Sequence, residues 1–291
     1  MENLQVRIAD VRDDRDHGSR WLVRETIAIL RDLTSQRDPA ISEEEQVRRL
    51  REAGHELAMA RPAMAALSGA VRHVLGAPGG LDGMAREAER LQTGYEQATV
   101  RITEHARPLL SGTLLTHSLS GTVLEVLLAC KEQLTEVIVL EGRPRYEGRE
   151  VAHALAAQGL AITLITDAQA DIFLPQCSAV VIGADTVLAD GSVLNKAGSA
   201  LLARACQGHG LPFYVLCETL KISPERWNGD LARLEEKEPE EVLPQPIPGV
   251  RARNFYFDRT PGELVTALIS ERGRMGREEI AAYTESLPPL P

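Results

Sequence analysis

The sequence predicts an α/β protein in which a helical N-terminal domain precedes a Rossmann-like, doubly wound parallel sheet. Three observations support this fold class. The first hundred or so residues carry apolar side chains at helical spacing, and from about residue 112 short apolar runs alternate with helical stretches. The chain also has 291 residues, enough for two domains of ordinary size. We therefore predict a helical domain over residues 1–110 and a ligand-binding domain over residues 111–291.

The N-terminal domain is expected to consist mainly of amphipathic helices. Residues 23–33 place four apolar side chains on one face, and Ser42 with Glu45 forms a capping-box start for the next helix. Another helix follows Pro62. The last and longest carries one continuous apolar stripe over residues 84–102 and should end at Pro108.

The C-terminal domain is expected to contain buried parallel strands, because its apolar runs are too short for helices and are apolar on both faces. The runs are 113–116, 137–140, 162–165, 179–182 and 212–216. Helices are predicted between or after them near 120–131, 148–158, 196–208 and 262–271. Residues 226–253 are rich in Glu and Pro, so they are predicted to form a surface excursion that could serve as a flap over a ligand.

Composition limits the partners that this chain can have. Lys and Arg total 32 against 42 Asp and Glu, which gives a net charge of −10, and only 4% of the residues are aromatic. An acidic chain with few aromatic side chains is a poor nucleic-acid binder, so any anionic ligand must be held locally. No stretch has the apolar length of a membrane span, and residues 1–18 lack the pattern of a signal peptide. We expect a cytoplasmic protein without membrane contacts.

The common cofactor and metal motifs are missing from the sequence. It has no G-x-G-x-x-G after the first strand, no Walker A loop, no H-E-x-x-H and no G-x-S-x-G. The seven histidines, among them His17 and His117, show no metal-ligand spacing. The four cysteines are widely spaced and are expected to be reduced core thiols. We therefore predict neither a cofactor nor a metal.

Polar residues gather where ligands bind in an open parallel sheet, beyond the carboxyl ends of the strands. Four segments are expected there: 116–122, 141–145, 183–185 and 195–196, the last opening a helix. They supply hydroxyls, two arginines, a carboxylate and a lysine, which suits a sugar phosphate. Simpler interpretations stay open: Ser118, Ser120 and Thr122 could only cap the next helix, and Arg143 and Arg145 could form surface ion pairs.

Six stretches between residues 113 and 273 carry a family resemblance: LLTHSLSGTV, VLEGRPRYEGRE, ITLITDAQA, VVIGADTVLADGSVLNKAGS, PFYVLCETLKISPE and FDRTPGELVTALISERG. They resemble the superfamily of the alpha, beta and delta subunits of translation initiation factor 2B, methylthioribose-1-phosphate isomerase and ribose-1,5-bisphosphate isomerase. The segments 191–196 and 217–221 look most like the last of these. The resemblance implies a helical N-domain, a Rossmann-like C-domain and dimerisation through the C-domain.

The resemblance also implies roles for individual residues. Asp185 matches the carboxylate of the isomerases' acid/base pair, and Ser118 stands where they carry a cysteine. The expected ligands of phosphate and sugar hydroxyls are Arg143, Arg145, Asn195, Lys196, Ser120, Gly121 and, from the helical domain, Arg61. A serine hydroxyl is a far poorer proton acceptor than a thiol unless a base lies beside it. His117 precedes Ser118, but successive side chains of a strand point apart.

Two functions are therefore expected from the sequence. The first is an aldose-ketose isomerase acting on a phosphorylated pentose such as ribose 1,5-bisphosphate. The second is a non-catalytic regulatory or assembly protein, like the initiation-factor subunits, that senses a sugar phosphate or a nucleotide. Both would be homo-oligomers that need no cofactor.

Overall fold

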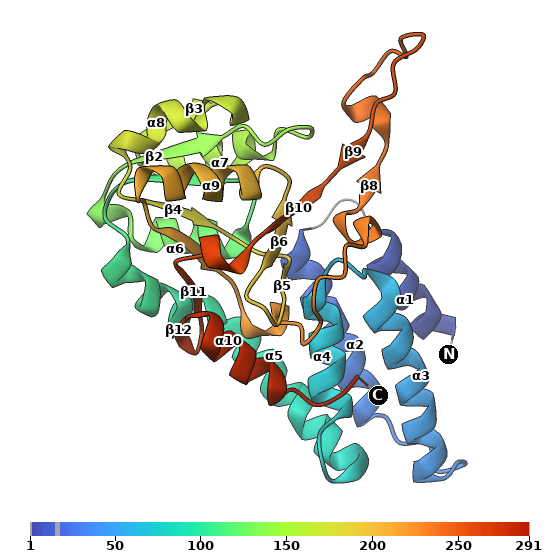
Figure 1. Ribbon diagram of the computed structural model, residues 1–291. Helices are drawn as coiled ribbons and strands as arrows, with labels where there is room; N and C mark the ends of the chain where they lie inside the picture. The colour runs from blue at the N-terminus through green and yellow to red at the C-terminus, as the bar shows by residue number, and fades with distance from the viewer. Residues whose placement is uncertain (1, 15–17, 291) are drawn as a thin grey trace.

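The computed structural model describes residues 2–14 and 18–290, in which a helical part packs against a sheet part (Figure 1). The helical part contains α1 (Glu2–Asp13), α2 (Ser19–Ser35), α3 (Glu43–Ala60), α4 (Ala65–Leu75) and α5 (Gly80–Ala106). Ser42 accepts a hydrogen bond from the backbone N–H of Glu45 at 3.2 Å, so the predicted capping start of α3 is confirmed. The interior of this part is formed by side chains such as Ile27, Leu57 and Leu67, which are fully buried.

The sheet part is built on seven strands. They are β1 (Gly112–His117), β2 (Leu134–Leu140), β3 (Ile162–Ile165), β4 (Ala179–Ile182), β7 (Phe213–Leu216), β11 (Ala267–Ser270) and β12 (Gly273–Met275), in the order β12-β11-β7-β4-β1-β2-β3. Every pair is parallel except β11 with β12. All five predicted strands are present, and the parallel strands follow the order of a doubly wound α/β fold, so the predicted fold class is confirmed.

The remaining elements connect or flank this sheet. The helices are α6 (Gly121–Ala129), α7 (Glu147–Ala156), α8 (Ala170–Phe173), α9 (Ser199–His209) and α10 (Arg277–Glu285). A second sheet joins β10 (Phe257–Thr260), β6 (Val193–Lys196) and β5 (Thr186–Val187), and a third pairs β8 (Glu236–Lys237) with β9 (Asn254–Phe255). The β8-β9 hairpin projects away from the body of the molecule (Figure 1). Residues 226–253 thus form the predicted surface excursion.

Two sequence predictions are wrong at the level of secondary structure. Residues 262–271 form a short 3-10 turn (Gly262–Leu264) and then strand β11, not a helix. All four residues of β11 are buried, and the strand hydrogen-bonds to β7 on one side and β12 on the other. Short apolar segments are ambiguous between helix and strand, and here strand pairing in the sheet decides.

The second error concerns Asn195 and Lys196, which close strand β6 and do not open a helix. Helix α9 starts three residues after Lys196, at Ser199. Gly198 comes just before it with φ of +108°, a backbone conformation that glycine adopts readily. Gly198 also faces the His117 ring closely, since a Cβ on it would lie 3.1 Å from Nε2.

The two parts of the molecule meet beside β5. The Thr186 hydroxyl donates to the carbonyl of Ala63 at 2.8 Å and accepts from the N–H of Ala65 at 3.1 Å, at the start of α4. Leu220 from the sheet part is buried in the core of the helical part. The helical part therefore bonds directly to the residue that follows Asp185.

Two chain-wide findings complete the description. All four cysteines are buried and free of disulfide bonds, as predicted. Within residues 2–14 and 18–290, none of the helices is both long enough and apolar enough to cross a membrane.

Candidate active site at the carboxyl edge of the sheet

The candidate site lies at the carboxyl edge of the sheet, at the point where the order of the strands reverses. Strands β1 and β4 are neighbours, and the chain moves from β1 outward to β2 and β3 on one side and from β4 to β7 and β11 on the other. In doubly wound sheets this switch point opens a crevice at the carboxyl ends of the strands. Ser118 follows β1 and Asp185 follows β4, so both predicted catalytic residues lie at this edge.

Ser118 belongs to a chain of three polar side chains from different elements. Its hydroxyl donates to Oε2 of Glu147 at 3.2 Å, and Oε1 of the same carboxylate accepts from Lys196 Nζ at 2.9 Å. Glu147 is the first residue of α7, and Lys196 is the last residue of β6. Lys196 is 4% exposed, and its ammonium lies 4.6 Å from the centre of the Tyr256 ring. The fold thus brings residues 118, 147 and 196 together.

Several charged side chains act on Asp185. Burial raises the pKa of its carboxyl, and the ammonium groups of Lys221 and Lys196 oppose this while Glu235 and Glu147 add to it. A carboxyl with a raised pKa takes up a proton more readily, which suits a general acid. Lys196 and Glu147 both shift the pKa of Asp185, and they are hydrogen-bonded to each other. Because Glu147 also accepts from the Ser118 hydroxyl, the charged groups around Asp185 extend to Ser118.

Lys221 hydrogen-bonds to the backbone of the residue before Asp185. It lies in the 3-10 turn Thr219–Lys221, and its Nζ donates to the carbonyl of Ala184 at 2.7 Å. Burial opposes the charge on Lys221, but Glu218 and Asp185 outweigh it and raise the pKa of this lysine. Glu218 is held in turn by the Thr122 hydroxyl at 2.6 Å. A buried ammonium therefore anchors the backbone just before Asp185.

His117 is not positioned to be the base of Ser118. Its Nε2 bonds to the carbonyl of Ala197 at 3.0 Å, and because a carbonyl only accepts, Nε2 carries the proton. Burial lowers the pKa of His117, and Nδ1 has no hydrogen-bond partner among the described residues. Cys217, which directly follows β7, is fully buried, and this burial raises the pKa of its thiol, so it is poorly suited to replace the family's cysteine.

The predicted phosphate ligands differ in their positions. Ser120 caps α6 by accepting from the N–H of Val123 at 3.3 Å, and Gly121 is the exposed first residue of that helix. Asn195 is buried and donates to the Ser199 hydroxyl at 2.9 Å. Ser120 therefore has the simpler role that the sequence left open, and its helix end still presents N–H groups at the sheet edge.

The two arginines of the segment after β2 are exposed. Arg143 donates to the Tyr146 hydroxyl at 2.6 Å, and the Asp167 carboxylate accepts from its backbone N–H at 2.8 Å. Arg145 lies close enough to Tyr256 to favour the charged form of that phenol. Neither guanidinium contacts Ser118 or Asp185, so the structure leaves both arginines on the rim of the site.

Arg61 lines a groove formed by residues of the helical part and of the excursion. It donates to the backbone carbonyls of Val11 and Asp14 near the end of α1. The groove has a volume of about 580 Å³ and includes Glu235 and Lys237 from the excursion. Glu235 also acts on Asp185, so this groove lies near the sheet edge, although among the described residues the hydrogen bonds of Arg61 go to Val11 and Asp14 and not to the other predicted ligands.

Three residues of the site have no role in the sequence-based prediction: Glu147, Lys221 and Tyr256. Two of them fall inside the stretches that carry the family resemblance, but nothing local marks them. Their roles come from contacts between residues that are 29 or more positions apart, as for Ser118 with Glu147. Among the described residues, which exclude His17, no cluster of three His, Cys, Asp or Glu side chains could hold a metal ion.

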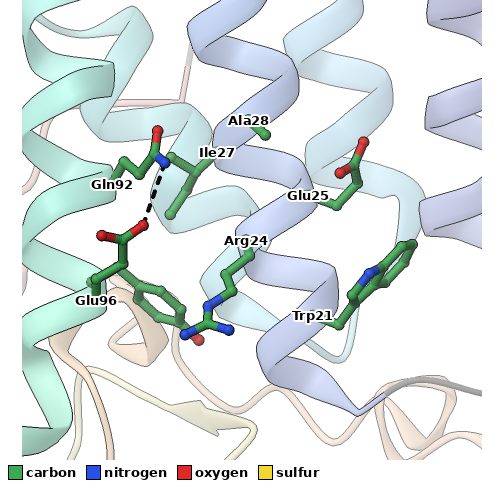
Figure 2. A pocket seen from close by; sticks show the side chains of 8 residues that line it. Trp21, Arg24, Glu25, Ile27, Ala28, Gln92 and Glu96 are labelled. Carbon is green, nitrogen blue, oxygen red and sulfur yellow. Dashed lines mark hydrogen bonds between the residues drawn. The ribbon is translucent and has the colours of Figure 1, made fainter.

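A second hollow, of about 200 Å³, lies in the helical part between α2 and α5. Figure 2 shows its lining, with Arg24 and Ile27 on α2 and with Gln92 and Glu96 hydrogen-bonded to each other on α5. It contains none of the predicted site residues. Ser118 and Asp185, the two predicted catalytic residues, both follow strands at the sheet edge, so we place the candidate site there.

Comparison with known proteins identifies the family of the chain. A protein from Pyrococcus horikoshii named putative translation initiation factor eIF-2B subunit 2-like is 32% identical over 277 residues, covering 94% of this chain and 96% of the relative. The ribose 1,5-bisphosphate isomerase of Archaeoglobus fulgidus is 32% identical over 248 residues, covering 81% and 79%. The crystal structure of the Pyrococcus horikoshii translation initiation factor eIF-2B superposes with a TM-score of 0.77 at 32% identity, covering 94% and 97%. The sequence pattern of the Initiation factor 2 subunit family matches residues 15–276, and the chain belongs to that family.

Proposed function

We propose that this chain is a sugar-phosphate isomerase that interconverts the aldose and ketose forms of a phosphorylated pentose such as ribose 1,5-bisphosphate. The observation that carries the proposal is Asp185, a carboxyl of raised pKa that follows β4 at the switch point of the sheet and feels the charges of Lys196 and Lys221. The similarity to a ribose 1,5-bisphosphate isomerase over 81% of this chain supports the same function.

The reaction needs an acid and a base but no redox partner. A cyclic aldose 1-phosphate becomes an open ketose when its C2 hydroxyl loses a proton, the C2 hydrogen moves with its electron pair to C1, and the bond from C1 to the ring oxygen breaks as that oxygen gains a proton. Asp185, whose raised pKa favours the protonated form, is the proposed donor to the ring oxygen. Ser118 is the proposed contact of the C2 hydroxyl from the opposite side of the switch point.

The phosphate groups are proposed to bind at the rim of the site. Arg143 and Arg145 present exposed guanidinium groups there, and the start of α6 at Ser120 and Gly121 presents backbone N–H groups. Asn195 and Lys196, which are buried beside the site, are proposed to contact sugar hydroxyls. Arg61 is the proposed ligand from the helical part, and its bonds to the carbonyls of Val11 and Asp14 leave further N–H donors for an anion.

A second function has a specific observation in its favour. The eIF-2B subunit 2-like relative covers 94% of this chain at the same identity as the isomerase. Together with a serine at position 118, this supports a regulatory or assembly protein that uses the pocket to sense a sugar phosphate or a nucleotide.

An isomerase assay with ribose 1,5-bisphosphate and methylthioribose 1-phosphate separates the two functions. We expect turnover by the wild type and a fall in kcat of about 100-fold or more in Asp185→Asn, the range for loss of an acid/base group. Ligand binding measured by calorimetry without any turnover would reject the enzyme and support the sensor.

Self-association is also proposed. Large apolar side chains stand exposed on neighbouring helices of the sheet part, Ile172 on α8 and Leu201 on α9, where a second copy would remove them from water. Light scattering on the purified protein should give a mass of at least two chains of 31.8 kDa. A mass of one chain at micromolar concentration would refute self-association.

A further inference from the structure

We infer that Glu147 is the base that makes Ser118 functional, a positioning and proton-accepting residue that works through the serine hydroxyl. The inference rests on the proposed isomerase function and deepens it. A serine hydroxyl needs an adjacent base to take up a proton near neutral pH. Within the described part of the chain, Glu147 is the carboxylate that the structure places in hydrogen-bond contact with Ser118.

The geometry of Ser118 favours this pairing. Its backbone has φ of +67°, in the left-handed region that residues other than glycine adopt rarely and that is common at functional sites. In this conformation the hydroxyl reaches the first turn of α7 and donates to Glu147 Oε2 at 3.2 Å. Because an ionised carboxylate only accepts, the serine is the donor, and its oxygen lone pairs stay available for a substrate proton.

Glu147 itself is fixed by contacts on both oxygens. Lys196 Nζ lies 2.9 Å from Oε1, and the lysine side chain is only 5% exposed, whereas that of Glu147 is 23% exposed. The almost buried Lys196 ammonium therefore orients the Glu147 carboxylate, which stays partly exposed to solvent. A group that must release its proton to water after each turnover needs this connection.

The proton steps balance without any further reactant. The C2 hydroxyl of the sugar gives its proton to Ser118 Oγ, while the Ser118 hydroxyl proton passes to Glu147 Oε2. As the C2 carbonyl forms, the C2 hydrogen moves to C1 with its electron pair, the bond between C1 and the ring oxygen breaks with its electron pair on oxygen, and the ring oxygen takes the proton of Asp185. Glu147 then returns a proton to solvent and Asp185 regains one, so the enzyme ends as it began.

A double-mutant experiment separates this role from simple support of Lys196. Glu147→Gln should lower kcat by about 100-fold in the protein with Ser118, with little change in KM. A thiol of ordinary pKa near 8.5 ionises far more readily than a hydroxyl and can act without a neighbouring carboxylate. Glu147→Gln should therefore cost only a few-fold when combined with Ser118→Cys.

The control is Glu150→Gln, which removes an exposed carboxylate one turn further along α7 and should leave kcat unchanged. An equal loss from Glu147→Gln in both backgrounds would overturn the inference, because a structural role does not depend on the group at position 118. That outcome leaves the proposed function standing, because the wild type still turns over. Absence of turnover by the wild type, whether or not Ser118→Cys is active, would instead overturn the proposed function and this inference with it.

Discussion

At the scale of single residues, the site holds buried charged groups, and removing such groups from water lowers the stability of the fold. Asp185 has a raised pKa even though two ammonium groups lie near it, so desolvation and the neighbouring carboxylates outweigh the lysines. Residues that act chemically are often held in environments that cost stability. Asp185 should therefore contribute to turnover and detract from the free energy of unfolding.

Asp185→Asn tests this trade-off through pH. The ordinary pKa of the carboxyl is 3.8, and the folded value is higher. The charged carboxylate thus costs stability above the folded pKa, and the cost disappears below 3.8, where both states are protonated. We expect Asp185→Asn to have a higher Tm than the wild type at pH 7, with the difference shrinking toward pH 4. Thermal unfolding followed by circular dichroism measures it, and a lower Tm at pH 7 would contradict the argument.

At the scale of elements, the junction between β2 and α7 decides where Glu147 points. Gly148, the second residue of α7, lies against the end of β2, and a Cβ on it would be 1.8 Å from the carbonyl oxygen of Leu140. Backbone atoms cannot rotate away from such an overlap. The absence of a side chain at position 148 therefore lets α7 begin directly above the strand and present Glu147 to Ser118.

Gly148→Ala should lower the free energy of unfolding by about 2 kcal/mol or more and reduce turnover, because the helix must shift. The matched control is Gly94→Ala in the middle of α5, where a Cβ meets nothing within 4 Å. Alanine should stabilise that helix by about 0.5–1 kcal/mol. Urea titrations of both variants give the comparison, and equal stabilities would show that α7 is less tightly packed than we describe.

At the scale of the whole molecule, the Thr186 hydroxyl is one of the links between the helical part and the carboxyl edge of the sheet. Thr186 is fully buried, and it bonds both to Ala63 and to the N–H of Ala65 in the first turn of α4. The first N–H groups of a helix have no partner within it, so a residue of the sheet part completes this helix start. The same residue adjoins Asp185, so the packing of the two parts fixes the position of the proposed acid.

Thr186→Val keeps the shape of the side chain but removes both hydrogen bonds. Leaving buried backbone groups without partners should cost about 1–3 kcal/mol in the free energy of unfolding and lower kcat. Thr93→Val, which removes an exposed hydroxyl bonded within α5, should be almost neutral. If Thr186→Val were equally neutral in denaturant unfolding and in turnover, the two parts would not be coupled at this point.

The sequence by itself determined the parts of the fold whose pattern is local. Five apolar runs became strands, Ser42 capped a helix, and the segments after β1 and β4 reached the carboxyl edge of the sheet. Hydrophobic periodicity, cap residues and the rule for parallel sheets suffice for such features, because each depends on a few adjacent residues.

The tertiary structure alone decided the features that depend on distant residues. Residues 267–270 became a strand because β7 and β12 pair with them, and Lys196 became the end of a strand through its register with Phe257 on β10. The contact between Ser118 and Glu147 joins residues 29 positions apart through the packing of α7 on β2. Sequence shows which side chains can carry the chemistry, and only packing sets which of them touch, because hydrogen bonds and ion pairs form over a few ångströms in space whatever their separation along the chain.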